Sequence, residues 1–563
     1  MTRKLCWNLC LCAVLSLLPA TLFAAPPIPV PPAAAPDRAQ QNLQSEPERP
    51  EVGGAPVVTL PEQIPPKEAA PEGPTFKLTA IVLENATAFP KSELEAIYND
   101  YIGTIVSLDA LNDIASDITV HYRNAGYILS RAIIPPQHVV NGVVTIRIVE
   151  GVIDKVVFEG VPPTSDLLNE YAERIRSAKP LDEATLERYL LLINDLPGVH
   201  AQAVLRPSET PGASDVLITL SQKYADGSIT ADNRGSRYLG PYQGSITANA
   251  NNAFGLYDRT QFHGVATAQS DEENFGQVSH EEQLDDDGTK LTLSGGRTRT
   301  NPGYKLKDFD VQGEDVTLAA DISHPFIRSR QSNLYGDIDF DTRNTDTDEL
   351  EQFQTGDRLR VLRAGGAYDF VDNFQATNKI QTQISKGFGW FDSSTPDTRS
   401  NLRGQTNFYK ATAQASRQQP ISGPFALYIA GTGQLSSDAL LSAEQFGLGG
   451  AQFGSAYDPS EITGDSGAAG RVELQFTSAT QANLGYQLYG FYDIGKVWVR
   501  DAAAGTKPEQ SLADAGIGTR FMILEPLSAS LELAFPLTRA VEANNTNGDG
   551  NDARVFLSLG YQY

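Results

Sequence analysis

Residues 449–498 read GGAQFGSAYDPSEITGDSGAAGRVELQFTSATQANLGYQLYGFYDIGKVW, and the two parts of this stretch differ in pattern. Residues 449–470 contain six glycines, one proline and three acidic residues but no apolar run, which predicts a long loop that needs a surface to fold against. Residues 484–498 alternate instead, with an apolar row formed by Leu484, Tyr486, Leu488, Tyr492 and Ile494. This period of two predicts a β-strand that faces two media. Asp493 lies in the other, mixed row, where a polar lumen would tolerate it and lipid would not.

Two motifs in this stretch resemble the sixth extracellular loop and the following strand of TpsB transporters, the ShlB/FhaC/HecB family of outer-membrane proteins in two-partner secretion. The strand matches a Phe-x-Asp-x-Gly motif at Phe491, Asp493 and Gly495. The loop matches at Phe453, Gly454, Ser455, Ala456, Tyr457, Asp458, Gly464, Asp465 and Gly467. The resemblance implies that the loop folds back into a sixteen-stranded β-barrel. One position departs from the family pattern: the loop has no arginine near Ser455 to pair with Asp493, so this aspartate must find another partner or water.

The composition of the 563-residue chain fits a barrel protein of several units better than a soluble acidic protein. The net charge of −25 argues against nucleic-acid binding, because that function requires a basic face. Charged residues make up only 20% of the chain, and its mean hydropathy is −0.27. Helical membrane spans would raise this mean hydropathy, whereas barrel strands alternate polar and apolar residues and keep it near that of soluble proteins.

The first 24 residues have the layout of a secretory signal peptide, with a basic start at Arg3 and Lys4 and an apolar core over residues 5–18. The three cysteines of the chain all lie in this segment, at Cys6, Cys10 and Cys12. Cleavage after Ala24 would therefore leave a mature chain without thiols, which suits passage through an oxidising periplasm. A retained membrane anchor is the alternative interpretation, and the short apolar core argues against it.

Residues 25–75 are crowded with proline and contain almost nothing to bury, which predicts an extended linker rich in polyproline II conformation. TpsB proteins often have a helix at this place that plugs the barrel. In this chain only residues 38–45 could form such a helix, and so short a helix is marginal without packing.

Residues 76–151 predict a small unit of the order β-α-α-β-β. Residues 92–101 and 107–124 have helical spacing, with Ser107 as the expected N-cap of the second helix. Two strands follow, separated by the turn Asn141-Gly142. The order, together with the segments YRNAGYILSRAIIPPQ and IRIVEG, resembles a POTRA domain of the ShlB type.

Residues 152–223 repeat this order, with helices expected over residues 165–177 and 182–195, and predict a second POTRA-like domain. Two such domains in tandem are what the TpsB family has, whereas BamA-like insertases usually carry more. The alternative is a pair of small α+β domains with no binding role.

From residue 224 to residue 563 every recognisable element is a strand of period two, and no apolar run is long enough for a spanning helix. The predicted fold class is therefore a membrane β-barrel of about sixteen antiparallel strands, preceded by two α+β POTRA-like domains. The last strand carries an apolar row formed by Val555, Leu557, Leu559, Tyr561 and Tyr563. We expect this row to face lipid, and it resembles the signal by which the barrel-assembly machinery recognises outer-membrane barrels.

Enzyme chemistry finds no support in the sequence. Gly464-Asp465-Ser466-Gly467 looks like the nucleophile segment of trypsin-like proteases, but none of the six histidines lies in a matching protease motif. The patterns HExxH, CxxC and GxxxxGK[ST] do not occur in the chain, so we expect no catalytic residue, no metal site and no cofactor.

The resemblance implies an outer-membrane translocator of a two-partner secretion system, with POTRA domains in the periplasm of a Gram-negative cell. These domains would capture an unfolded, large β-helical partner of the TpsA type, such as an adhesin or haemolysin, and feed it through a monomeric barrel. Capture by β-augmentation needs a strand edge. The candidate edge residues are Leu129, Ser130, Arg131, Ala132, Ile133 and Ile134, followed by Val144, Ile146 and Ile148.

Two alternatives of other classes stay open at this point. A BamA-like insertase would act by opening the seam between the first and last strands, and loss of its POTRA domains would harm many outer-membrane proteins at once. A passive porin would need no POTRA domains, so their deletion would leave solute conductance intact and no secreted protein missing.

Overall fold

The structure, a computed structural model, describes residues 30–42, 75–269, 271–390, 393–478, 484–502, 507–523, 526–541 and 550–563. The predicted signal peptide and most of the predicted linker lie outside these residues. Among the helices described, none has the length and apolar content needed to cross a membrane.

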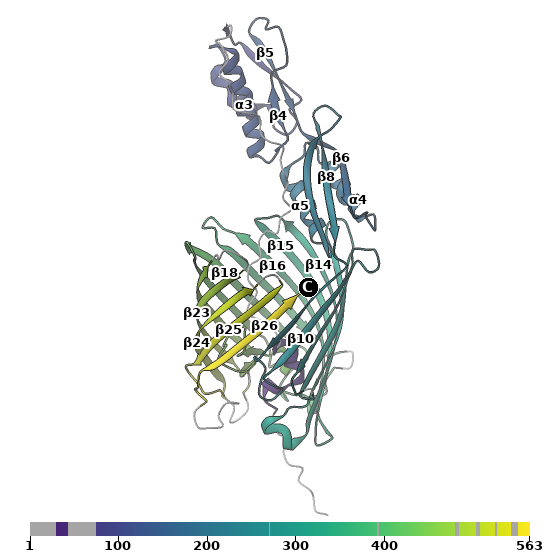
Figure 1. Cartoon of the computed structure of the whole chain (residues 1–563), viewed down its shortest axis with the longest axis vertical. Helices are drawn as coiled ribbons and strands as arrows, with labels where there is room; N and C mark the ends of the chain where they lie inside the picture. Colours follow the sequence, from purple (N-terminus) through teal and green to yellow (C-terminus); the bar gives the residue numbers. More distant parts are fainter. Residues whose placement is uncertain are drawn as a thin grey trace, which may run out of the picture. The chain divides into compact units, whose positions relative to one another are not determined.

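Sixteen strands close into an antiparallel barrel (Figure 1), as the sequence predicts. Neighbours in the chain are neighbours in the barrel, and the last strand pairs with the first. The strands are β9 (Ala225–Asp232), β10 (Gln243–Asn251), β11 (Arg259–Thr267), β12 (Glu273–Gln283), β13 (Lys290–Thr300), β14 (Val311–Arg328), β15 (Ser332–Glu349), β16 (Gln352–Val371), β17 (Thr377–Gly387), β18 (Tyr409–Ser422), β19 (Phe425–Ser436), β22 (Ser466–Ser478), β23 (Leu484–Trp498), β24 (Glu509–Ile523), β25 (Leu527–Pro536) and β26 (Arg554–Gln562).

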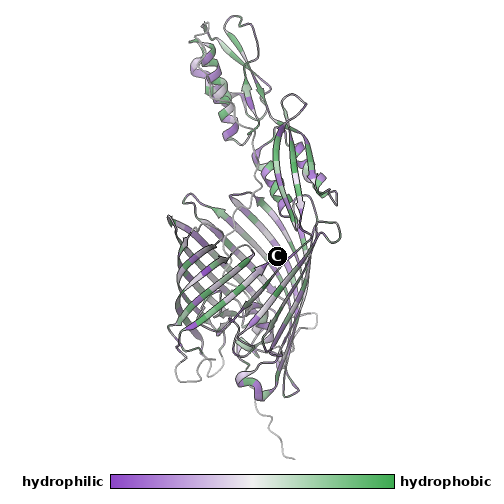
Figure 2. Cartoon of the chain, in the orientation of Figure 1, coloured by the Kyte–Doolittle hydropathy of each residue, from purple (hydrophilic) through white to green (hydrophobic). Residues whose placement is uncertain are grey.

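The side chains of β23 follow the predicted alternation. Leu488 and Ile494 are 48% and 54% exposed on the outer face, whereas Phe491 and Asp493 are buried inside the barrel at 5% and 0%. The five apolar side chains of the last-strand row are likewise exposed. Figure 2 shows the same change between hydrophilic and hydrophobic residues along many strands. The barrel therefore has an apolar outer surface and a polar interior.

The prediction of a loop over residues 449–470 is wrong at its C-terminal end. Ile462–Gly464 forms β21, which pairs with β20 (Phe446–Leu448), and β22 already begins at Ser466. The small residues at 467–470 give no strand pattern. At Gly467 the fold requires the absence of a side chain, because a Cβ there would overlap the ring of Phe446. We call residues 437–465, between β19 and β22, the lumen loop.

The first α+β unit keeps the predicted order β-α-α-β-β, with one addition, a two-residue strand between the two helices. Its elements are β1 (Phe76–Lys77), β2 (Ala80–Glu84), α2 (Lys91–Tyr98), η3 (Asn99–Tyr101), β3 (Ile105–Val106), α3 (Leu108–Asn124), β4 (Arg131–Ile133) and β5 (Val143–Val149). The Ser107 hydroxyl caps α3 by accepting from the Ala110 N–H at 3.2 Å. Asn141 and Gly142 both have positive φ (57° and 73°), as the predicted two-residue hairpin turn needs.

The expectation that residues 144–148 form a free edge is wrong. The sheet order is β2-β5-β4, so β5 is the central strand and pairs on both sides. Its inward side chains, including Val144 and Ile146, are fully buried against α3. β4 is an edge strand, but the Ala132 N–H already donates to Thr119 Oγ1 of α3 at 2.9 Å.

The second unit contains β6 (Val152–Gly160), α4 (Leu167–Ser177), α5 (Glu183–Asn194), β7 (Val199–Pro207) and β8 (Ala213–Gln222), in the predicted order. Asp182 caps α5 by accepting from the Thr185 N–H at 2.8 Å. Helix side chains such as Leu190 and Ile193 pack on Ile218 of β8 in a buried core. The α+β repeat predicted for residues 152–223 is thus present in the fold.

The N-terminal segment, residues 32–42, lies inside the barrel. It forms η1 (Pro32–Ala34), η2 (Pro36–Arg38) and one turn of α-helix, α1 (Ala39–Asn42). The predicted helix over residues 38–45 overlaps α1, and residues 43–45 lie outside the described residues. The remaining short helices are η4 (Tyr304–Phe309), η5 (Pro396–Thr398) and η6 (Ser442–Glu444).

Candidate functional site

The lumen loop packs its β20–β21 hairpin on the inner face of β22 and β23. Leu448 of β20 lies over Gly495 of the strand motif, where a Cβ would come within 2.6 Å of Leu448 Cδ1. Phe453, Ala456 and Tyr457 of the loop are buried in the same apolar cluster as Leu448. The glycines of both motifs therefore make room for the loop inside the barrel.

Asp493 finds its cationic partner on the barrel wall. Arg471 of β22 lies directly opposite it in the strand register. Arg471 Nε donates to Asp493 Oδ1 and Arg471 Nη2 donates to Asp493 Oδ2, both at 2.7 Å. The two side chains are 2% and 0% exposed. This bidentate pair takes the place of the loop arginine that the resemblance implies and this chain lacks.

The loop itself contacts Asp493 through its backbone. Gly454 N–H and Ser455 N–H donate to Asp493 Oδ2 at 2.9 and 3.3 Å. Gly454 has φ +97°, a conformation that favours glycine, and it turns the two N–H groups toward one oxygen. The Ser455 hydroxyl also accepts from Arg471 Nη2 at 2.6 Å. The motif residues Gly454, Ser455 and Asp493 are thus brought together, with Arg471 completing the site.

A second buried carboxylate accepts from the loop backbone next to Asp493, and we call the two carboxylates, Asp493 and Asp514, the cradle of the loop. Asp514 of β24 is opposite Asp493 in the register and is fully buried. The Ala456 N–H donates to Asp514 Oδ2 at 2.9 Å. Three successive backbone N–H groups of the loop, from residue 454 to residue 456, therefore bind carboxylates of two adjacent strands.

The next two motif residues bind the wall through their side chains. The Tyr457 hydroxyl donates to the Ala513 carbonyl at 3.0 Å. Asp458 forms an ion pair with Arg554 of β26 at 2.7 Å, and its side chain is 1% exposed. Both side chains thus fix the loop to strands on the C-terminal side of β23.

The other end of the lumen loop is tied to strands earlier in the chain. Glu444 lies between Arg363 of β16, whose Nη2 is 2.8 Å from Glu444 Oε1, and Lys410 of β18. The Gln434 side chain of β19 donates to the Glu444 carbonyl at 2.9 Å. The loop thus bridges the interior from β16 and β18 to β23, β24 and β26.

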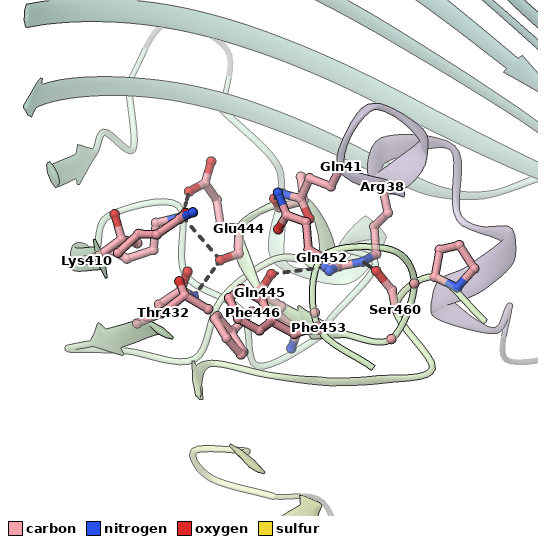
Figure 3. A pocket seen from close by; sticks show the side chains of 18 of the residues that line it. Arg38, Gln41, Lys410, Thr432, Glu444, Gln445, Phe446, Gln452, Phe453 and Ser460 are labelled. Atoms are coloured by element: carbon pink, nitrogen blue, oxygen red, sulfur yellow. Dashed lines mark hydrogen bonds and ion pairs between the residues drawn. The ribbon is translucent and has the colours of Figure 1, made fainter. Parts of the chain in front are cut away.

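Residues 32–42 rest on the same loop (Figure 3). Arg38 is buried and donates to the Ser442 carbonyl at 2.6 Å, to the Gln445 carbonyl at 3.2 Å and to the Ser460 hydroxyl at 3.2 Å. Gln41 donates to the Ala443 carbonyl at 2.7 Å. Beside these contacts lies a polar cavity of about 380 Å³, lined by Arg38, Arg363, Lys410 and Glu444 among others.

Asp465, the last residue of the lumen loop, holds the end of the loop in place through hydrogen bonds. It accepts from the Leu440 N–H at 2.8 Å and from the Arg500 N–H at 2.7 Å. The neighbouring Ser466 hydroxyl accepts from the Ser436 N–H at 3.2 Å. The segment that resembles a protease nucleophile is therefore used here for loop and strand contacts. Among the described residues, no group of three or more metal-ligating side chains is gathered.

The sequence motifs missed four side chains of this site: Arg471, Asp514, Arg554 and Glu444. Arg471 and Asp514 are found only once the strand register is known, because it places each of them opposite Asp493. The alternating pattern of β26 puts Arg554 on the inner row. A cation that faces the barrel interior indicates that an acidic side chain lies nearby, so this signal could have been used.

Curated relatives match most of the chain. A heme/hemopexin transporter protein HuxB of Haemophilus influenzae is 24% identical over 483 residues, covering 83% of this chain and 85% of the relative. The outer membrane transporter CdiB of Escherichia coli is 24% identical over 449 residues, covering 75% of this chain and 72% of the relative.

Solved structures share the fold. CdiB from Escherichia coli superposes with a TM-score of 0.72 at 20% identity, covering 89% of this chain and 93% of that chain. CdiB from Acinetobacter baumannii gives a TM-score of 0.63 at 16% identity, covering 90% and 95%. Residues 76–151 match the ShlB-type POTRA domain, and residues 212–521 match the model of the haemolysin secretion/activation proteins. The chain therefore belongs to the haemolysin secretion/activation protein family ShlB/FhaC/HecB.

Proposed function

We propose that this outer-membrane translocator of a two-partner secretion system exports its unfolded partner through the barrel lumen, with the lumen loop and residues 32–42 closing the passage at rest. Membership of the family favours export over the insertase and porin alternatives. The observation that carries the proposal is the cradle in which the loop backbone at residues 454–456 binds Asp493 and Asp514. Such polar contacts hold the loop firmly yet can be exchanged for contacts with an extended chain or water.

Partner capture belongs to the POTRA domains on the periplasmic side. Of the two edges expected from the sequence, only β4 is an edge strand. A partner strand that adds to it must compete with Thr119 for the Ala132 N–H. Thr119→Val should therefore leave this N–H free and increase crosslinking of the partner to a cysteine introduced by Arg131→Cys. Thr104→Val, in the same domain, should leave the crosslinking yield unchanged.

The partner would be a large secreted protein with a β-helical fold, and its folding outside the cell would draw the chain outward. The barrel would act as a monomer, with all sixteen strands paired in one chain. We assign the last-strand row, which includes Val555 and Tyr561, to recognition by the barrel-assembly machinery as well as to contact with lipid.

Export of the partner into the medium tests the role of the loop. We expect Asp493→Ala, and replacement of residues 449–461 by a short Gly-Ser linker, to reduce export severalfold while the partner accumulates in the periplasm. A deletion of residues 449–470 would not test this role, since it removes β21 and the start of β22. Glu314→Gln, at a half-exposed carboxylate paired with Arg297, is the matched control. Normal export by both loop variants at normal barrel levels would contradict the proposal.

A further inference from the structure

The barrel closes where β26 meets β9, and this seam is only partly built from paired strands. The register runs from Ser558 opposite Asp232 to Gln562 opposite Ser228, so residues 554–557 of β26 have no partner in β9. On its other side β26 pairs with β25 from Arg554 onward. One end of the seam is therefore short of strand pairing.

The side chain of Asn233 completes the ladder at this end. Its Nδ2 donates to the Val555 carbonyl at 2.9 Å, and its Oδ1 accepts from the Leu557 N–H at 2.7 Å. A backbone bond from Asn233 N–H to the Leu557 carbonyl is 3.3 Å long. A single asparagine thus satisfies the backbone where β9 has ended, and further support at this end must come from side chains.

The lumen loop supplies such support. Arg554, the first residue of β26, forms an ion pair with Asp458 of the loop at 2.7 Å. Its Nη1 also donates to the Ala456 carbonyl at 3.1 Å. The Asp458 and Arg554 side chains are 1% and 13% exposed, so water screens this pair little.

The contacts continue from Arg554 across the seam. The guanidinium carbons of Arg554 and Arg234 lie 5.0 and 4.7 Å from the ring centroid of Phe556 on β26. Arg234 follows β9 and forms an ion pair with Glu532 of β25 at 3.2 Å. A cluster of two arginines on one aromatic ring therefore spans the seam, balanced by Asp458 from the loop and Glu532 from the wall.

We propose that the lumen loop fastens the seam between β9 and β26, with Asp458 as the carboxylate that neutralises the arginine pair around Phe556. When the loop leaves its seat, Asp458 leaves with it, and the two guanidinium groups, which are 13% and 16% exposed, lose one of the carboxylates that balance their charge. Their repulsion in a weakly screened site loosens the end of the seam that Asn233 holds. The inference rests on the proposed function only in that export displaces the loop, and its test does not depend on export.

Hydrogen exchange of the purified full-length protein in detergent tests this coupling. Asp458→Asn keeps the size of the side chain and removes its charge. We expect amides of residues 225–233 and 554–562 to exchange on the order of tenfold faster, while amides of β14 and β15 keep their rates. The charge exchange Asp458→Arg with Arg554→Asp should restore the seam rates at least in part.

Glu444→Gln is the matched control, because it releases the loop from β16 and β18 without touching Arg554. It should speed exchange in the loop and leave the seam unchanged. The proposal is overturned if Asp458→Asn speeds exchange in the loop alone, or if both variants loosen the seam equally. Should Asp458→Asn give no folded barrel, Arg554→Gln breaks the same ion pair from the other side, and seam exchange at the wild-type rate would then overturn the proposal.

Discussion

The buried pair of Arg471 and Asp493 offers the sharpest test of how the loop is held. Arg471→Met keeps a long apolar side chain in contact with the Phe491 ring and removes the guanidinium, whose carbon lies 4.8 Å from that ring centroid. Asp493 then loses two hydrogen bonds of 2.7 Å and retains only the backbone N–H groups of the loop. The change leaves Asp493 and Asp514 adjacent in the register, both buried.

The size of the effect follows from burial. Both partners are at most 2% exposed, so water cannot compensate for the lost charge. Removing one member of such a pair costs about 3–5 kcal/mol, because the other remains as an uncompensated buried charge. We expect Arg471→Met to lower the free energy of unfolding of the barrel by about this amount, whereas an exposed ion pair would contribute about 0–1 kcal/mol.

A double-mutant cycle measured by urea unfolding in detergent micelles tests the reasoning. Asp493→Asn alone leaves Arg471 without its acid and should also destabilise strongly. The double variant removes both charges, and the amide oxygen that it introduces at position 493 can still accept from the Gly454 N–H. It should therefore be more stable than the sum of the two single changes predicts, by about 2 kcal/mol or more. Additive effects, or an Arg471→Met barrel as stable as the wild type, would refute the pairing argument.

Three further changes test other parts of the site. Arg38→Ala removes three hydrogen bonds to the lumen loop and should raise the permeability of reconstituted vesicles to small solutes, whereas unchanged permeability would show that residues 32–42 do not limit the pore. Gly467→Leu should displace Phe446 and expose the loop to protease while the barrel keeps its heat-modifiable mobility on gels, and a protected loop would contradict this packing. In the first POTRA domain, burial works to raise the pKa of Glu150, but hydrogen bonds from Thr87, Ala88 and Tyr122 outweigh it and hold the pKa below 4.5. This carboxylate thus contributes stability above its unfolded pKa and loses that stability as the pH falls through the folded value. The protection factors of amides in residues 76–151, which are corrected for the intrinsic pH dependence of exchange, should therefore fall in acid, and Glu150→Gln should abolish most of that fall.

Most of the fold was accessible from the sequence because alternation and capping are local signals. The strand over residues 484–498 and the N-cap at Ser107 needed no knowledge of distant residues. The start of β22 was missed for the opposite reason. Gly467 is small because Phe446 of the lumen loop region packs against it. This contact comes from a distant part of the chain, so the strand sequence alone does not reveal it.

The site was predicted only as far as the motifs reach. The motifs single out Asp493 and Gly454 separately, and the structure joins them by a hydrogen bond. Arg471 lies just beyond the predicted loop over residues 449–470, in a stretch for which the sequence predicts no element, and Asp514 becomes a partner only through the register of β23 and β24. The edge assignment for residues 144–148 failed because strand order in a sheet depends on pairing, and a hairpin pattern leaves open which strand lies in the middle.

The placement of the arginine on the wall changes what release of the loop costs. A loop that carried the arginine would have to separate two buried opposite charges in order to leave. Here Arg471 stays with Asp493 on adjacent strands, and the loop parts with backbone hydrogen bonds at residues 454–456, which an extended polypeptide can replace with its own N–H groups. The charged residues of the loop are five carboxylates and no cation, and two of them, Glu444 and Asp458, leave their cationic partners on the wall. A displaced loop therefore makes the lumen more positive, which favours the entry of acidic segments of a passing chain. Export rates of partners that differ only in the charge of one segment would measure this effect, and equal rates for acidic and basic segments would rule it out.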